Sequence, residues 1–283
     1  MTTTDTPTSR TWTARHWGRW RESAALAPLL GMSWRRLHSP TLFLWGRALQ
    51  SNPKHWPTPV KQQAWQVDPV GIESWRRDLL RDESRIARID LGAGSRGVSM
   101  KPSSVRVKDL ARRSLTPPRD VLALCRWLGC IAPEGKFLEL GTSLGVTSAY
   151  VASSGWHVDT WEGCPQTLAK AQEGWGQLGM EDRVQSELGP FQHRLDELNP
   201  EKQWDVIYVD GFHEERATLN MVDRLASHAR VCIVVDDIAW SPGMHRAWHA
   251  LQKRPEWRVS FSWKGRGFLV KAPHMAPQHH ALA

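Results

Sequence analysis

The strongest constraint in the sequence is an apolar segment that passes through a glycine turn into a helix. The apolar run from Phe137 to Leu140 predicts a short buried strand, and the pattern from Val146 to Ala152 predicts a helix directly behind it. Gly141 and Gly145 frame the turn, where a side chain would keep a ligand away from the backbone. The unpaired amides at the start of the helix favour an anionic group. This unit therefore predicts a ligand-binding site.

Strand and helix patterns alternate along the rest of the second half of the chain. Further strands are expected at residues 157–162, 183–187, 204–210 and 231–237, each followed by a helical pattern. A last pair of strands, 257–263 and 267–271, is separated by a Lys-Gly-Arg segment. Alternating strands and helices form parallel sheets. We therefore expect an α/β, Rossmann-like domain with a mostly parallel sheet over residues 119–271.

The flanking segments have other patterns. Residues 1–11 are rich in Thr, Ser and Pro and are expected to be disordered, as is the tail 272–283. Residues 12–118 predict an N-terminal helical accessory segment, with a strong amphipathic helix from Gly71 to Ile89. A second glycine motif, Asp90 to Gly97, competes as a cofactor loop. Because a polar helix is expected before it and no helix behind it, we interpret it as a structural or substrate-side loop.

Charge is distributed unevenly along the chain, whose formal net charge is +8. Residues 1–119 hold 21 Lys and Arg against 9 Asp and Glu, while the remainder holds 16 against 20. A basic leading segment can face nucleic acid, an anionic lipid or an acidic substrate, or it can be a solvated surface. The 17 tryptophans are scattered or helically spaced, which favours a role in packing over base stacking.

The four cysteines and the hydropathy pattern bear on location. The cysteines show no C-x-x-C spacing, which is typical of buried, reduced thiols in a cytoplasmic protein. No apolar run approaches the roughly 18 residues of a membrane span, so we expect no membrane association.

Acidic residues stand at or near the ends of several expected strands. Glu139 precedes Gly141, Glu162 ends the second strand, and Asp210 ends the strand that begins at residue 204. Asp236 and Asp237 end the next strand. Ligands of open α/β sheets bind at these carboxyl ends. Carboxylates gathered there repel one another unless a cation or a positive ligand group lies between them.

One histidine lies close to these acids. His213 follows Asp210 by three residues, and a histidine with an ordinary pKa near 6.5 can take a proton at neutral pH. We interpret His213 as a candidate base, with a hydrogen bond inside its own loop as the alternative role.

The motifs together resemble a known family. Glu139-Leu-Gly-Thr-Ser-Leu-Gly145, Glu162-Gly163, Asp210-Gly-Phe-His213 and Asp236-Asp-Ile-Ala-Trp-Ser241 occur in this order. Over about residues 36–271 the chain resembles class I S-adenosylmethionine-dependent methyltransferases, in a bacterial group whose substrates are not established. It is also similar to catechol-type O-methyltransferases. The resemblance implies a sheet closed by the C-terminal antiparallel hairpin.

The resemblance implies roles for individual residues. S-adenosylmethionine would be bound by Glu139, Gly141, Thr142, Ser143, Gly145, Thr147, Glu162, Gly163, Phe191 and Asp210, with Glu162 on the ribose. Catechol-type enzymes place metal ligands where this chain has Asp210, Asp236 and Asp237, so Mg²⁺ is one prediction. The alternative is that Asp210 contacts the cofactor and the other two cap a loop. His213 replaces the lysine base of that type, which puts a catechol acceptor in doubt.

We therefore expect methyl transfer to a small-molecule acceptor, at an oxygen atom, with His213 and Asp210 as catalytic residues. An RNA methyltransferase that uses the basic N-terminal segment is one alternative, although no RNA-binding module is recognisable. A non-catalytic cofactor-binding subunit is another. A homodimer is an assembly that these features allow.

Overall fold

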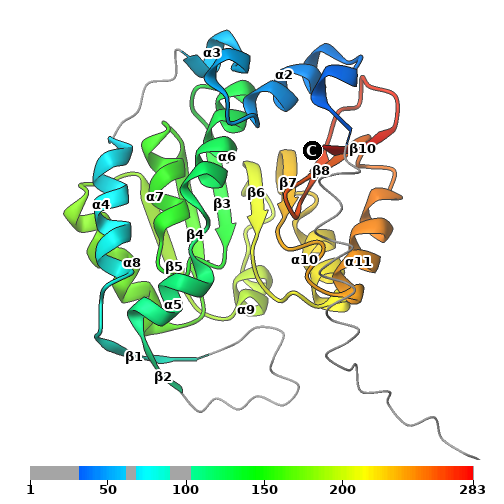
Figure 1. Cartoon of the computed structure of the whole chain (residues 1–283). Helices are drawn as coiled ribbons and strands as arrows, with labels where there is room; N and C mark the ends of the chain where they lie inside the picture. Colours follow the sequence, from blue (N-terminus) through cyan, green and yellow to red (C-terminus); the bar gives the residue numbers. More distant parts are fainter. Residues whose placement is uncertain (1–31, 62–67, 90–102, 283) are drawn as a thin grey trace, which may run out of the picture.

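The computed structural model describes residues 32–61, 68–89 and 103–282, and these ranges form the fold in Figure 1. The predicted disordered segment 1–11 and the glycine motif from Asp90 to Gly97 lie outside the described residues. Within the described ranges, no helix is long and apolar enough to cross a membrane.

The described residues form an eight-stranded sheet in the order β10-β8-β9-β7-β6-β3-β4-β5. Strands β3 to β7 run parallel, β9 is antiparallel to both β7 and β8, and β10 is parallel to β8. This is the Rossmann-like arrangement expected from the sequence, hairpin included. The strands span β3 (Lys136–Leu140), β4 (His157–Glu162), β5 (Val184–Leu188), β6 (Trp204–Val209), β7 (Ala229–Val235), β8 (Val259–Trp263), β9 (Arg266–Val270) and β10 (Gln278–Leu282).

Helices cover both faces of the sheet, because successive strand residues point to opposite sides. Phe137 packs in one core cluster and Leu138, its neighbour, in the other. The first cluster includes α2 (Pro40–Ala48), α4 (Pro69–Leu79), α5 (Val107–Ser114), α6 (Pro118–Ile131), α7 (Val146–Ser153) and α8 (Pro165–Gln177). The second includes α9 (Phe191–Asp196), α10 (Glu215–Leu225) and α11 (Pro242–Gln252). The short α3 (Thr58–Lys61) lies near α6. The N-terminal helices thus share one core with the sheet.

The segment before the sheet is not wholly helical, so the prediction of a helix from Gly71 to Ile89 is wrong in its second half. Helix α4 ends at Leu79, and β1 (Arg85–Arg88) pairs antiparallel with β2 (Ser103–Arg106). Asp82 begins the change of direction, because its carboxylate accepts a hydrogen bond from the backbone N–H of Ser84 at 2.8 Å. Such a local bond favours a turn over a helix.

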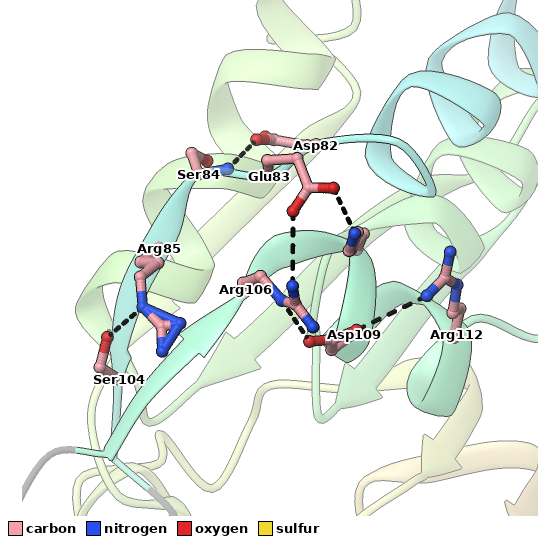
Figure 2. Close-up of polar contacts among 9 residues, drawn as sticks. Asp82, Glu83, Ser84, Arg85, Ser104, Arg106, Asp109 and Arg112 are labelled. Atoms are coloured by element: carbon pink, nitrogen blue, oxygen red, sulfur yellow. Dashed lines mark hydrogen bonds and ion pairs between the residues drawn. The ribbon is translucent and has the colours of Figure 1, made fainter.

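Ion pairs attach this β1–β2 ribbon to α5, as Figure 2 shows. Glu83 accepts a hydrogen bond from Lys108 and lies 3.7 Å from the Arg106 guanidinium. Arg106 also donates to Asp109 at 2.7 Å, and Asp109 lies 3.6 Å from Arg112. Much of the positive charge in this segment is therefore matched by acids beside it.

Part of the C-terminal tail forms a strand, and the prediction of disorder over 272–283 is wrong for residues 278–282. These residues form β10 on the edge of β8, with the backbone N–H of Gln278 donating to the carbonyl of Arg258 at 2.9 Å. Met32 adds a bridge on the other side of β10, donating to the carbonyl of Ala281 at 2.6 Å. Unpaired groups on an edge strand readily accept another strand. Leu282 is only 8% exposed.

We expect Leu282→Ala to lower the free energy of unfolding by about 2 kcal/mol, because it removes a buried side chain and leaves a cavity. Urea denaturation followed by circular dichroism measures this change. His274→Ala, at an exposed position of the same tail, is the control and should have little effect. Equal stability of both variants would mean that the tail does not pack as described.

Candidate active site

A cavity of about 720 Å³ lies at the carboxyl ends of the parallel strands. The connection between α5 and α6 forms another part of its wall. The predicted site residues that line it are Gly141, Ser143, Glu162, Gly163, Phe191, Asp210, His213, Asp236 and Asp237. The predicted residues Glu139, Thr142, Gly145 and Thr147 are not among its lining residues. The topology therefore brings most of the predicted set to one place.

The glycine turn has steric reasons for both of its glycines. Gly141 has φ of +103°, and a Cβ there would lie 2.0 Å from the carbonyl oxygen of Asp210. Gly145 has φ of +74°, and its Cβ would lie 2.7 Å from Ala171 and Trp175 of α8. Trp175 also donates its indole N–H to the Gly145 carbonyl at 2.9 Å. Gly145 thus allows close packing of α7 on α8, whereas Gly141 lies on the cavity.

Glu162 is fixed between the turn and α8. One carboxylate oxygen accepts the backbone N–H of Ser143 at 2.8 Å, and the other accepts that of Cys164 at 2.9 Å. Burial raises the pKa of Glu162 above its usual value, although these amide hydrogen bonds oppose the shift. The carboxylate keeps lone pairs for a ligand, since each oxygen can accept two hydrogen bonds.

Glu139 lies beneath the cavity, buried to 1% exposure. Its carboxylate accepts hydrogen bonds from the hydroxyls of Ser148 and, at 3.2 Å, Thr160. Burial raises the pKa of Glu139 to about 7. Glu139 thus links β3, β4 and α7 and is not among the residues that line the cavity.

The acids at the ends of β6 and β7 have different partners. Asp236 is buried, accepts a hydrogen bond from the Tyr208 hydroxyl and lies 3.5 Å from the guanidinium of Arg266. Arg266 also donates to the Tyr208 oxygen at 2.9 Å. Asp237 has φ of +54° and donates its N–H to the Asp236 carboxylate at 2.8 Å. The arginine of the hairpin therefore compensates one aspartate of the pair.

His213 lies between the two remaining carboxylates. Its Nε2 is 3.9 Å from Asp210 Oδ1 and 3.8 Å from Asp237 Oδ2. Burial, together with the charges of Asp236 and Asp237, raises the pKa of Asp210 well above its usual value. The buried Nδ1 of His213 has no hydrogen-bond partner among the described residues. The ring centroid of Trp240 is 6.0 Å from that of His213.

A methyltransferase domain family matches residues 138–238, the segment that supplies the strand ends of the cavity. This segment is a methyltransferase domain. No curated protein matches the chain.

Solved structures resemble the chain at low identity. The cofactor-bound protein Rv0187 from MTB is 20% identical, with a TM-score of 0.48, over 56% of this chain and 82% of that one. An O-methyltransferase from Bacillus cereus in complex with SAH is 18% identical, with a TM-score of 0.46, over 57% and 83%. The SAH-bound methyltransferase PaMTH1 from Podospora anserina is 16% identical, with a TM-score of 0.44, over 56% and 83%.

The aspartates of the methyltransferase domain do not fit the predicted metal site. Among residues 32–61, 68–89 and 103–282, no three His, Cys, Asp or Glu side chains are grouped as metal ligands. Asp236 already accepts a hydrogen bond from Tyr208 and forms an ion pair with Arg266. A divalent cation bound to the same carboxylate would be repelled by the positive charge of Arg266. The geometry favours the alternative in which the Asp pair has a structural role in its loop.

Several cavity residues of the domain and its N-terminal neighbour were not predicted as site residues. They come from β1 and the residue behind it, from α5, α6 and their connection, from α8, from the loops behind β5, β6, β7 and β8, and from the start of β9: Arg88, Ile89, Leu110, Arg113, Ser114, Leu115, Thr116, Pro117, Asp120, Thr167, Pro190, Gly211, Phe212, Trp240, Lys264 and Arg266. Gly211, Phe212 and Trp240 lie in motifs quoted from the sequence, and Lys264 and Arg266 belong to the expected Lys-Gly-Arg turn. The others are contributed by segments whose approach to the strand ends has no local sequence signal.

Glu139 should make the stability of the methyltransferase domain depend on pH. Its pKa is about 7 when folded, against an ordinary 4.5, so the folded state binds its proton more tightly. This contribution is complete below pH 4.5 and is lost as the pH rises through 7, amounting to about 3 kcal/mol. Relative to Glu139→Gln, the wild type should lose that stability between these pH values. Urea denaturation across the range measures the difference.

The exposed Glu187 of β5 provides the control, since Glu187→Gln should remain parallel to the wild type over the same pH range. A constant stability difference between the wild type and Glu139→Gln would contradict the assignment of a buried, readily protonated Glu139.

Proposed function

We propose that this protein transfers a methyl group from S-adenosylmethionine to an oxygen of a small-molecule acceptor. One observation carries the proposal: a single cavity is lined by the Gly141 turn with Glu162 held against it, and also by His213 between Asp210 and Asp237. The residues proposed to bind the cofactor and the candidate base thus line the same cavity.

Glu162 would accept hydrogen bonds from the ribose hydroxyls, because its backbone partners leave part of its acceptor capacity unused. Gly163 and Phe191 line the same cavity and would lie beside the adenosine. Asp210 lies on the other side of the turn, where its carbonyl approaches Gly141. Its carboxylate would stabilise the positive charge of the sulfonium, which supplies the methyl group when the cofactor is bound.

His213 would take the acceptor's hydroxyl proton on Nε2. The imidazolium formed would then lie about equally far from the carboxylates of Asp210 and Asp237, and both would stabilise its charge. Catalysis would otherwise depend on holding the acceptor oxygen in line with the methyl group. Mg²⁺ has no part in this proposal, since the aspartates do not fit a metal.

The contacts of the basic segment favour this proposal over RNA methylation. Arg76 donates to the Thr116 carbonyl at 2.5 Å, and Arg106 and Lys108 pair with Glu83. These cations serve the protein's own structure.

The four cysteines are free, which fits the predicted cytoplasmic location. The homodimer stays a prediction.

Glu162→Ala should weaken S-adenosylmethionine binding roughly 10- to 100-fold, because hydrogen bonds to a charged group contribute about 1.5–3 kcal/mol. Isothermal titration calorimetry measures the affinity. Glu187→Ala, on the adjacent strand β5, is the matched control and should bind like the wild type. Unchanged affinity in Glu162→Ala would show that the ribose lies elsewhere.

His213→Gln should lower the methyl transfer rate by about 10²- to 10⁴-fold, the usual contribution of a positioned base, without changing cofactor affinity. Transfer of a labelled methyl group to a library of hydroxylated small molecules measures the rate. His193→Gln on α9 is the exposed control.

The same assay with EDTA, and with added Mg²⁺, tests the metal separately. We expect no effect of either. A rate that His213→Gln leaves intact would remove the base from the proposal, and a rate abolished by EDTA would restore the metal.

A further inference from the structure

We propose that the methyl acceptor carries an anionic group bound by Arg113, while an apolar part of the acceptor covers Trp240. This inference rests on the proposed function and specifies the chemical class of its substrate: a hydroxylated organic acid with a flat, apolar body. The charge balance of the cavity is the first reason for it.

The carboxylates that line the cavity leave none of their charge for Arg113, because each contacts another group of the protein. Asp120 accepts a hydrogen bond from Lys264 at 2.5 Å, and Asp236 faces Arg266. Glu162 is held by two backbone amides. The remaining two, Asp210 and Asp237, flank His213. Two of the lining cations, Lys264 and Arg266, are thereby compensated, and Arg88 lies close enough to Glu162 to lower the pKa of that carboxyl.

Arg113 differs from these cations. It lies in the last turn of α5, is exposed, and lines the cavity. Within the described ranges, no carboxylate lies within ion-pair distance of it. Its planar guanidinium can bind a carboxylate or phosphate through two parallel hydrogen bonds. An anionic group on the acceptor would supply the missing counter-charge.

The neighbouring Arg112 provides a direct comparison with Arg113. Both arginines lie in the last turn of α5, where either cation interacts favourably with the helix dipole. Arg112 lies 3.6 Å from Asp109 and is not among the residues that line the cavity. If Arg113 were only a surface cation at a helix end, the two positions would be equivalent.

Trp240 supplies the apolar part of the subsite. Its side chain is 52% exposed, and among the exposed large hydrophobic residues of the described chain it is the one that lines the cavity. Leu110 and Leu115 line the same cavity. An apolar body laid on the indole would remove this surface from water. Because the Trp240 and His213 rings are 6.0 Å apart, a hydroxyl on that body can reach the base.

The test uses the full chain loaded with S-adenosylhomocysteine, after calorimetry has shown that this product binds. The probes are 4-hydroxybenzoate and 6-hydroxy-2-naphthoate, each paired with its neutral amide. The variants are Arg113→Gln, Arg113→Lys, Arg112→Gln and Trp240→Ala. Affinities of the probes are measured by calorimetry, and the thermal midpoint and the product affinity of each variant show whether its fold is intact.

We expect the acids to bind at least about tenfold more tightly than their amides, the effect of one charge-assisted bidentate contact. Arg113→Gln should abolish that difference, Arg113→Lys should keep part of it, and Arg112→Gln should keep all of it. Trp240→Ala should weaken acids and amides alike.

The inference is overturned if the loaded protein binds the acids no better than the amides, or binds neither. It is also overturned if Arg113→Gln and Arg112→Gln behave alike. Failure of the product itself to bind would instead refute the proposed function, and the acceptor subsite with it.

Discussion

Acidic side chains that end at one edge of the sheet impose the main electrostatic constraint on this structure. The carboxyl ends of parallel strands lie at the same edge of a sheet, so the parallel pairing of β4, β3, β6 and β7 brings Glu162, Asp210 and Asp236 to that edge. Their charges are unfavourable together in a buried place. Backbone amides stabilise the carboxylate of Glu162, and the guanidinium of Arg266 compensates that of Asp236. Asp210, with its raised pKa, is the acid left for a positive ligand group.

The hairpin and the α5–α6 connection complete what the strand ends begin. Lys264 lines the cavity from the β8–β9 turn, where it has a φ of +47°, and Arg266 lines it from the first position of β9. Ser114, at the end of α5, accepts a hydrogen bond from the Ser143 hydroxyl of the glycine turn at 2.9 Å. The ribbon is attached as well, through Ala87, whose N–H donates to Gln166 of α8 at 2.5 Å. The N-terminal segment is therefore part of the cavity wall.

Sequence periodicity predicted the sheet well because the central strands β3, β6 and β7 are largely buried on both faces and end at a turn or a polar residue. The predicted helix from Gly71 to Ile89 was wrong in its second half, because the helical spacing of apolar residues continues into β1. The choice between helix and strand there depends on pairing with β2, whose residues lie 15 to 21 positions away from their partners. The prediction for the tail failed for a similar reason. The segment from Gln278 to Leu282 has little strand propensity, and it forms a strand because it pairs with the edge of β8 and with Met32.

The sequence by itself determined the alternation of strands and helices, the glycine turn at Gly141 and the carboxylates at the strand ends, because these follow from local periodicity and from the polarity of parallel strands. Only the tertiary structure decided which acids face the cavity. Glu139 is turned beneath it and Asp236 is compensated by Arg266, a residue 30 positions further along the chain. Charge compensation and burial depend on distances between segments that are remote in sequence, and no local pattern encodes those distances.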